Sequence, residues 1–149
     1  MIIGAQVVSN DNSWLCDSAW IGDLIQKFPA AHCGAVWGAE TIVASAREKH
    51  ALYEKSRCLA VDMESQCAAQ IAAEAKIPLG VIRVVCDSAE MSVPPVVMAA
   101  IAEDGRIDIP KALWHLARHP LEVLDLFGVM GGTGNALGVL KKTTDVLSD

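Results

Sequence analysis

Residues 58–87 read CLAVDMESQCAAQIAAEAKIPLGVIRVVCD, and this stretch decides the fold class. It begins with the short apolar run Cys58-Leu59-Ala60-Val61, which predicts a buried strand. It ends with Leu79–Cys86, which is apolar except for Arg83 and predicts a second buried strand. Continuous apolar strands on either side of a helix predict a right-handed βαβ crossover, in a parallel sheet covered on both faces.

The helix between these strands is predicted over Ser65–Lys76, a segment rich in Ala and Gln that stops before Pro78. Helical spacing places four apolar or small residues on one face, which we expect to be the packed face: Cys67, Ala68, Ile71 and Ala75.

The same alternation extends toward the N-terminus. Ile2–Ser9 predicts a strand, and the polar stretch Asn10-Asp11-Asn12-Ser13 predicts a turn after it. Asp17 or Ser18 can cap a helix whose apolar stripe is Trp20, Ile21, Leu24 and Ile25. A second strand is predicted over Ala35–Ala44 and a short charged helix over Ala46–Lys55.

The remainder of the chain is predicted to be helical. Pro94-Pro95 and Asp104-Gly105 interrupt it, and helices are expected to start at Pro110 and at Pro120. The glycine-rich segment 128–135 fits neither G-x-G-x-x-G nor the Walker pattern, so we interpret it as a loose connection from a helix to the tail. The predicted class is α/β, a three-layer α/β/α arrangement with a mostly parallel central sheet, in one domain over residues 1–149.

Composition excludes several classes of function. The chain has 149 residues, is 52% hydrophobic and carries a net charge of −6. It has no basic run longer than Lys141-Lys142, so we expect no nucleic-acid partner. No apolar stretch approaches the roughly 20 residues of a membrane helix, and the first residues lack the pattern of a signal peptide. We therefore expect no membrane span and a cytoplasmic protein.

The sequence also offers no convincing metal site. Its five cysteines are widely spaced, and none forms a C-x-x-C pair, so we expect buried free thiols. His115 and His119 stand four residues apart, a spacing that could hold zinc. No third ligand is evident, and a surface pair is the preferred interpretation.

Two acids stand directly after the strands of the opening stretch. Glu64 follows the strand predicted over 58–61, and Asp87 follows the strand predicted over 79–86. Ligands of open α/β sheets bind outside the carboxyl ends of the strands. If the two strands are neighbours, both acids face one crevice, where partial desolvation favours a proton on a carboxylate. The alternative is that Asp62, Glu64 and Asp87 only cap helices or loops.

Around these acids the sequence resembles a known superfamily, the nucleoside phosphorylases and methylthioadenosine nucleosidases. The residues that carry the resemblance are Asp62-Met63-Glu64-Ser65, like the D/E-M-E-S/A motif, and Arg83-Val84-Val85-Cys86-Asp87, like R-x-x-S/C-D. Within the superfamily the chain is similar to the hopanoid-associated phosphorylases, or adenosylhopane nucleosidases. The segments shared with them are Ile3-Gly4-Ala5 to Asn10-Asp11, Val43-Ala44-Ser45, Lys49 and Glu103-Asp104-Gly105-Arg106-Ile107-Asp108.

The resemblance implies cleavage of the N-glycosidic bond of a purine nucleoside, such as an adenosyl-hopanoid that releases adenine. It implies that Glu64 accepts hydrogen bonds from ribose hydroxyls, Met63 packs on the sugar, and Ser45 lines the base pocket. Asp87 would be the catalytic acid that donates a proton or a hydrogen bond to the purine at N7. These roles suit a reaction that builds positive charge on the sugar and negative charge on the base. Arg83, a charge inside an apolar strand, is expected to pair with Asp62 or Glu64.

The resemblance also implies what completes the site. In these families a glycine-containing phosphate loop and the acid that activates water lie in units that precede the strand matching Ile2–Ser9. Whether the reaction is hydrolysis or phosphorolysis, with inorganic phosphate as co-substrate and no cofactor, stays open. A homo-oligomer is expected. The competing hypothesis is a non-catalytic remnant that acts as a ligand-binding or subunit-forming module, and a flavodoxin-like redox or signalling domain is a third.

Overall fold

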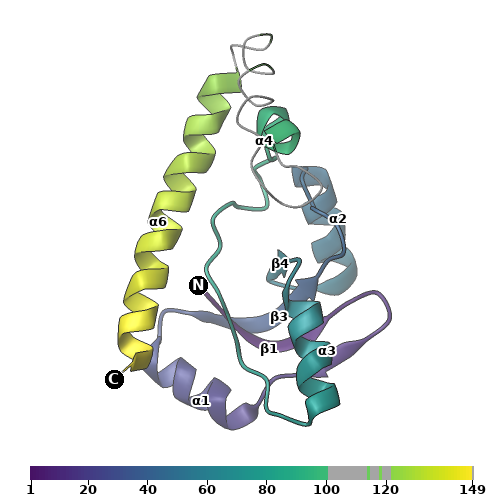
Figure 1. Cartoon of the computed structure of the whole chain (residues 1–149), viewed down its shortest axis with the longest axis vertical. Coiled ribbons are helices and arrows are strands. Elements are labelled where there is room, and N and C mark those ends of the chain that lie inside the picture. Colours follow the sequence, from purple (N-terminus) through teal and green to yellow (C-terminus); the bar gives the residue numbers. More distant parts are fainter. Residues whose placement is uncertain (101–113, 115–117, 119–121, 149) are drawn as a thin grey trace.

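A computed structural model describes residues 1–100, 114, 118 and 122–148 (Figure 1). The elements of its first half are β1 (Ile2–Val8), β2 (Ser13–Leu15), α1 (Ser18–Lys27), β3 (His32–Gly38) and α2 (Ala46–Ser56). Those that follow are β4 (Ala60–Asp62), α3 (Ser65–Ala75), β5 (Val81–Arg83), α4 (Pro95–Ala100) and α6 (Glu122–Ser148). The alternation of strands and helices confirms the α/β class.

The sheet is mixed. β1 pairs in parallel with β3, and β3 pairs in parallel with β4. On its other side β1 pairs antiparallel with both β2 and β5, at different ends of the strand. The expectation of a mostly parallel sheet is therefore wrong, as is the parallel crossover predicted around α3. β4 and β5 are not neighbours, because β1 and β3 lie between them.

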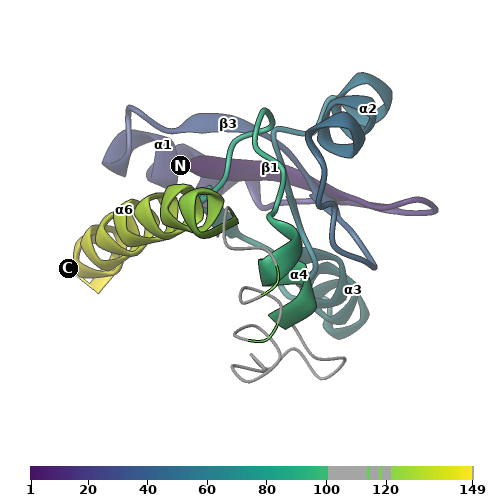
Figure 2. The same cartoon turned by 90° about the horizontal axis from the view of Figure 1, so that it is seen from above.

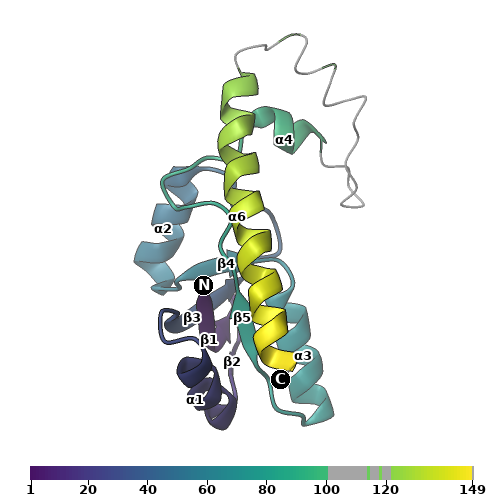
Figure 3. The ribbon, with the colours of Figure 1, turned by 90° about the vertical axis from the view of Figure 1, so that its left-hand side faces the viewer.

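Alternating side chains divide the core into two clusters. Val7 and Val36 are fully buried and belong to one cluster, together with Ala69 of α3. The next residues along these strands, Val8 and Trp37, belong to the other cluster, with Leu52 of α2. Successive strand residues point to opposite faces of a sheet, so α3 and α2 cover opposite faces. Figures 2 and 3 show these helices on either side of the strands.

Polar side chains begin the first two helices, Asp17 as the sequence predicts and Ser45 as the structure shows. The Asp17 carboxylate accepts the backbone N–H of Trp20 at 3.0 Å and caps α1. Ser45 caps α2 in a capping box, in which its hydroxyl accepts the Glu48 N–H and Glu48 accepts the Ser45 N–H. These bonds satisfy donors that the first turn of a helix cannot pair internally.

Helix α3 confirms its predicted span within one residue, but it does not pack through the predicted face. Its buried residues are Ser65, Ala69 and Ala72, whereas Cys67 and Ile71 are exposed, Ile71 by 58%. This face is packed because α3 approaches β3 closely. A Cβ on Gly38 would lie only 2.6 Å from the Gln66 Cβ, so the start of α3 lies against β3 where there is room only for small groups.

Two strands are shorter than their apolar runs. The strand predicted over 35–44 begins earlier, at His32, and ends at Gly38. The run over 79–86 forms only the three-residue β5. Conversely, Ser13-Trp14-Leu15 pairs with β1, although the sequence predicts a turn at Ser13. Hydropathy records that a segment is apolar, but pairing partners decide how much of it becomes strand.

Helix α6 runs along one side of the molecule (Figures 1 and 3). It contains the glycine-rich segment 128–135, so the predicted connection to the tail is wrong there. Its last turns contact the N-terminal part of the chain: Lys27 donates to the Val146 carbonyl at 3.3 Å, and Thr143 lies 3.5 Å from the Met1 sulfur. The helix start predicted at Pro110, and His115 and His119, lie outside the described residues. Among the described helices, none is long and apolar enough to cross a membrane.

Candidate active site

A polar cluster joins the end of β4 to the end of β5. The Asp62 carboxylate accepts the backbone N–H groups of Glu64 at 3.1 Å and Ser65 at 2.8 Å, so it caps the start of α3. It also accepts the Ser65 hydroxyl at 2.5 Å. Arg83 forms an ion pair with Asp62 through its Nε and donates to the Ser65 hydroxyl at 3.0 Å. We call Asp62, Ser65 and Arg83 the α3 cluster.

Glu64 stands at the edge of this cluster and stays open to solvent. Its Oε2 lies 3.6 Å from Arg83 Nη2, while its side chain is 75% exposed. The neighbouring Met63 is also exposed. The expectation that Arg83 pairs with Asp62 or Glu64 is confirmed for both acids. The Asp62 carboxylate is committed to the fold, whereas the Glu64 carboxylate keeps an oxygen available for a ligand hydroxyl.

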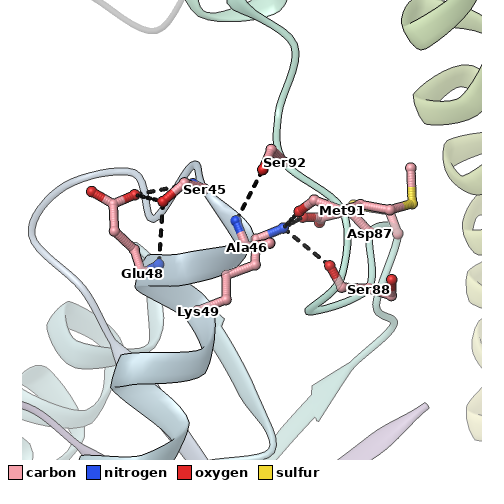
Figure 4. Close-up of polar contacts among 9 residues, drawn as sticks. Ser45, Ala46, Glu48, Lys49, Asp87, Ser88, Met91 and Ser92 are labelled. Atoms are coloured by element: carbon pink, nitrogen blue, oxygen red, sulfur yellow. Dashed lines mark hydrogen bonds and ion pairs between the residues drawn. The ribbon is translucent and has the colours of Figure 1, made fainter.

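A second polar cluster holds Asp87 against α2 (Figure 4). The ammonium of Lys49 donates to the Asp87 carboxylate, to the Met91 carbonyl at 2.7 Å and to the Ser88 carbonyl at 3.2 Å. Its side chain is 8% exposed, and that of Asp87 is 33% exposed. An ammonium has three donors, and all three are used here.

Two further bonds attach the same loop to the start of α2. The Ala46 N–H donates to the Ser92 hydroxyl at 3.0 Å, as Figure 4 shows, and the Val93 N–H donates to the Ala44 carbonyl at 2.7 Å. We call the contacts of Lys49, Asp87 and the loop 88–93 the α2 clasp. In the clasp the Lys49 side chain is buried, whereas the Asp87 side chain stays partly exposed.

The other oxygen of Asp87 has a partner from its own strand end. Cys86 Sγ lies 3.4 Å from Asp87 Oδ1, in the position of a thiol donor. Burial raises the pKa of the Cys86 thiol, and the hydrogen bond and charge of Asp87 raise it further. The thiol therefore stays protonated at neutral pH and can donate this bond.

Cys86, with Cys33 and Cys67, is exposed, which corrects the expectation that all five thiols are buried. Cys16 and Cys58 are buried, and burial is also the main reason that the pKa of each of these thiols is raised. Among the described residues, no group of three or more His, Cys, Asp or Glu could hold a metal ion.

The structure places Ser45 within the capping box of α2, where its hydroxyl also donates to Glu48 at 2.8 Å. This capping role accounts for a serine at position 45 without any bound ligand. Ser45 is nevertheless adjacent to Ala46, whose N–H meets the loop that follows Asp87, so it lies at the border of the α2 clasp.

The two acids belong to different polar clusters. Glu64 belongs with Arg83 and Asp87 with Lys49, and the strands before them are separated by β1 and β3. The premise that these strands are neighbours is therefore wrong. Two hollows, of about 440 and 300 Å³, lie beside α1 and β5 and between β2 and α3, and neither is lined by Glu64 or Asp87.

Lys49 is the residue that reasoning from chemistry missed. In the sequence only the resemblance points to it, because a lysine on a charged helix is normally solvated. Its role depends on the distance between α2 and a loop 38 residues further along the chain, which no local pattern reveals.

Comparison with known proteins identifies one family. A sequence model described as the phosphorylase superfamily matches residues 9–105, which is more than half of the chain and includes both polar clusters. No curated protein matches the chain.

Proposed function

Because the chain belongs to the phosphorylase superfamily, we propose that it acts on a purine nucleoside and cleaves the bond between ribose and base. The observation that carries the proposal is the family match over residues 9–105, which spans Ser45, Met63, Glu64 and Asp87. The proposed substrate is an adenosyl-hopanoid that releases adenine, which rests on the resemblance described above. The proposed fold is the three-layer α/β/α arrangement.

The exposed carboxylate of Glu64 suits the role of ribose acceptor. It lies directly before α3 and beside Arg83, and a ribose diol offers two hydroxyl donors to such a group. Its negative charge also stabilises the positive charge that develops on the sugar ring. Met63 provides an adaptable apolar surface next to it, suited to the face of a sugar.

Asp87 is proposed as the acid that assists the departing base. It is one-third exposed and fixed by a loop, so it can meet a purine that enters from solvent. A proton or hydrogen bond at N7 neutralises the negative charge on the leaving group, an effect worth about 10²–10⁴ in rate. Ser45 is proposed to border the base, since it starts the helix that holds this loop.

The activity test uses adenosine and adenosylhopane as substrates, each with and without inorganic phosphate, and measures free adenine. Release without phosphate indicates hydrolysis, and release that requires phosphate indicates phosphorolysis. If no adenine appears under either condition, the chain is not a nucleoside-cleaving enzyme. Equilibrium dialysis of adenosine then tests the competing hypothesis of a ligand-binding module, which predicts binding without turnover.

The substitution Asp87→Asn separates catalysis from binding. Asparagine still accepts the Lys49 bond but cannot supply a proton, so adenine release is expected to fall about 10²–10⁴-fold while adenosine binding is largely kept. Asp11→Asn, in the exposed turn after β1, is the matched control and should leave the rate unchanged. An unchanged rate for Asp87→Asn would refute the role of Asp87 and leave the family assignment intact.

A further inference from the structure

The α2 clasp has a geometry that the proposed chemistry does not by itself require. We propose that Lys49 is a positioning residue: it sets where the Asp87 carboxylate stands by fixing the loop 88–93 on α2. This inference rests on the proposed function, in which Asp87 is the acid. Lys49 itself touches neither sugar nor base in this role and acts only through Asp87.

The first argument is the distribution of the Lys49 bonds. One donor goes to the carboxylate of Asp87, and the other two go to backbone carbonyls of Ser88 and Met91. A cation that only balanced the charge of Asp87 would not need these carbonyls. By holding both the acid and the loop that follows it, Lys49 fixes the side chain and its backbone together.

The second argument is the asymmetry of burial. The Lys49 side chain is 8% exposed and that of Asp87 is 33% exposed. A buried ammonium has to keep its partners, because a desolvated charge without them is strongly unfavourable. The exposed acid is therefore the group that faces a ligand, and the buried cation is the fixed point to which it is tied.

The third argument is that the Lys49 contacts belong to a set that holds one short loop. Ser92 bonds to Ala46, the first residue of α2, about one turn before Lys49. Val93 bonds to Ala44, just before the helix. Ser45 caps the helix at the same place, so the anchoring end is itself fixed. Loops carry catalytic groups well only when a rigid element positions them, and here α2 is that element.

The test is a double-mutant cycle on adenine release. Lys49→Met keeps the length and apolar stem of the side chain but removes its charge and donors, and kcat is expected to fall about 10²-fold, as for a misplaced catalytic group. KM should change much less than kcat, because Lys49 does not contact substrate. In the Asp87→Asn background the same substitution should cause no further loss, since both changes act on one group.

Two variants separate positioning from general damage to the fold. Lys49→Arg keeps a cation that can reach the acid, and it should recover part of the rate lost in Lys49→Met. Arg47→Met removes an exposed cation from the same helix and should behave as wild type. If Lys49→Met keeps the wild-type rate, or if its loss adds fully to that of Asp87→Asn, the positioning role is refuted.

A readout without catalysis keeps this inference distinct from the proposed function. The amide protons of Ala46 and Val93 donate across the clasp, so their hydrogen exchange should accelerate in Lys49→Met and not in Arg47→Met. If the wild-type chain releases no adenine, the proposed function fails, and exchange still decides whether Lys49 anchors the loop. Unchanged exchange in a folded Lys49→Met protein would overturn the anchoring itself.

Discussion

The α3 cluster and the α2 clasp each pair one cation with an acid at a strand end, but they differ in which partner is buried. In the α3 cluster the acid is the buried partner: the Asp62 side chain is 10% exposed and that of Arg83 is 32% exposed. In the α2 clasp the cation is the buried partner, and Asp87 reaches solvent. In one ion pair the acid is therefore part of the packed structure, and in the other the acid stays partly exposed.

The difference shows which acids are available for chemistry. Asp62 uses its oxygens on the first N–H groups of α3, on Ser65 and on Arg83. It is a capping residue, as the alternative interpretation of the sequence proposed for it. Glu64 and Asp87 keep part of their carboxylates exposed, although each touches a cation. Position after a strand identified three acids, and only their partners separate a structural acid from the two candidates for function.

The largest effect on stability is expected from Asp62→Ala. The substitution removes the acceptor at the start of α3 and of the Ser65 hydroxyl, and it leaves Arg83 with only the exposed Glu64. The free energy of unfolding should therefore fall by about 2–4 kcal/mol. Urea denaturation measures this change. Glu64→Ala, at the exposed neighbouring acid, is the control and should lie within about 0.5 kcal/mol of wild type. Equal losses at both positions would contradict the division between structural and available acids.

A smaller loss is expected from Gly38→Ala, which tests the close contact beneath the α3 cluster. The new Cβ would lie 2.6 Å from the Gln66 Cβ and 2.9 Å from its backbone nitrogen, which forces α3 to shift. Overpacking of this kind costs about 1–3 kcal/mol. Gly22→Ala is the matched control, since nothing lies within 4 Å of its Cβ position in α1, and it should stabilise by about 1 kcal/mol.

If Gly38→Ala leaves the thermal midpoint unchanged, α3 does not depend on close approach to β3. A second, spectroscopic outcome sharpens the result. Resonances of the α3 cluster should shift in Gly38→Ala, and those of the α2 clasp should not, because the two helices cover opposite faces of the sheet.

The smallest effect is expected at the start of α2 and depends on pH. The Ser45 backbone N–H, followed by its hydroxyl, lowers the pKa of Glu48 from its ordinary value of 4.5. A carboxyl with a lowered pKa in the folded state stabilises the protein above pH 4.5, and this contribution is lost as the pH falls through the folded-state pKa. Thermal unfolding between pH 3 and 7 should show a difference between wild type and Glu48→Gln that shrinks toward low pH. A difference that is constant over this range would contradict the capping role of the Glu48 charge.

The helices were predictable because their signals are local. The cap expected at Asp17 predicted the start of α1, and the charged segment from Ala46 predicted α2. Pro78 ended the helical segment that contains α3. The inward face of α3 was not predictable in the same way. Hydropathy selected the side with Ile71, but packing against β3 selected the side with the small residues Ala69 and Ala72. The space that β3 leaves admits only small side chains, so side-chain size and not apolar area decided which face of α3 is packed.

In the candidate site, too, local features were predictable from the sequence and contacts between distant segments were not. The sequence supplied the acids, their place after apolar runs and the need of Arg83 for a carboxylate, because a charge within an apolar strand has to be paired. It could not supply the partner of Asp87, since Lys49 looks like any helix-surface lysine until the loop folds onto it. It also suggested neighbouring strands, whereas β5 pairs antiparallel with β1.

By itself, then, the sequence determined the α/β class, the starts of the first helices and the identity of the acids, all of which depend on neighbours within a few residues. Tertiary structure alone decided the strand order, the packed face of α3 and the pairing of Lys49 with Asp87. These depend on free energies of contact between segments far apart in the chain. Such contacts compete with one another across the whole fold, and local preference does not rank them.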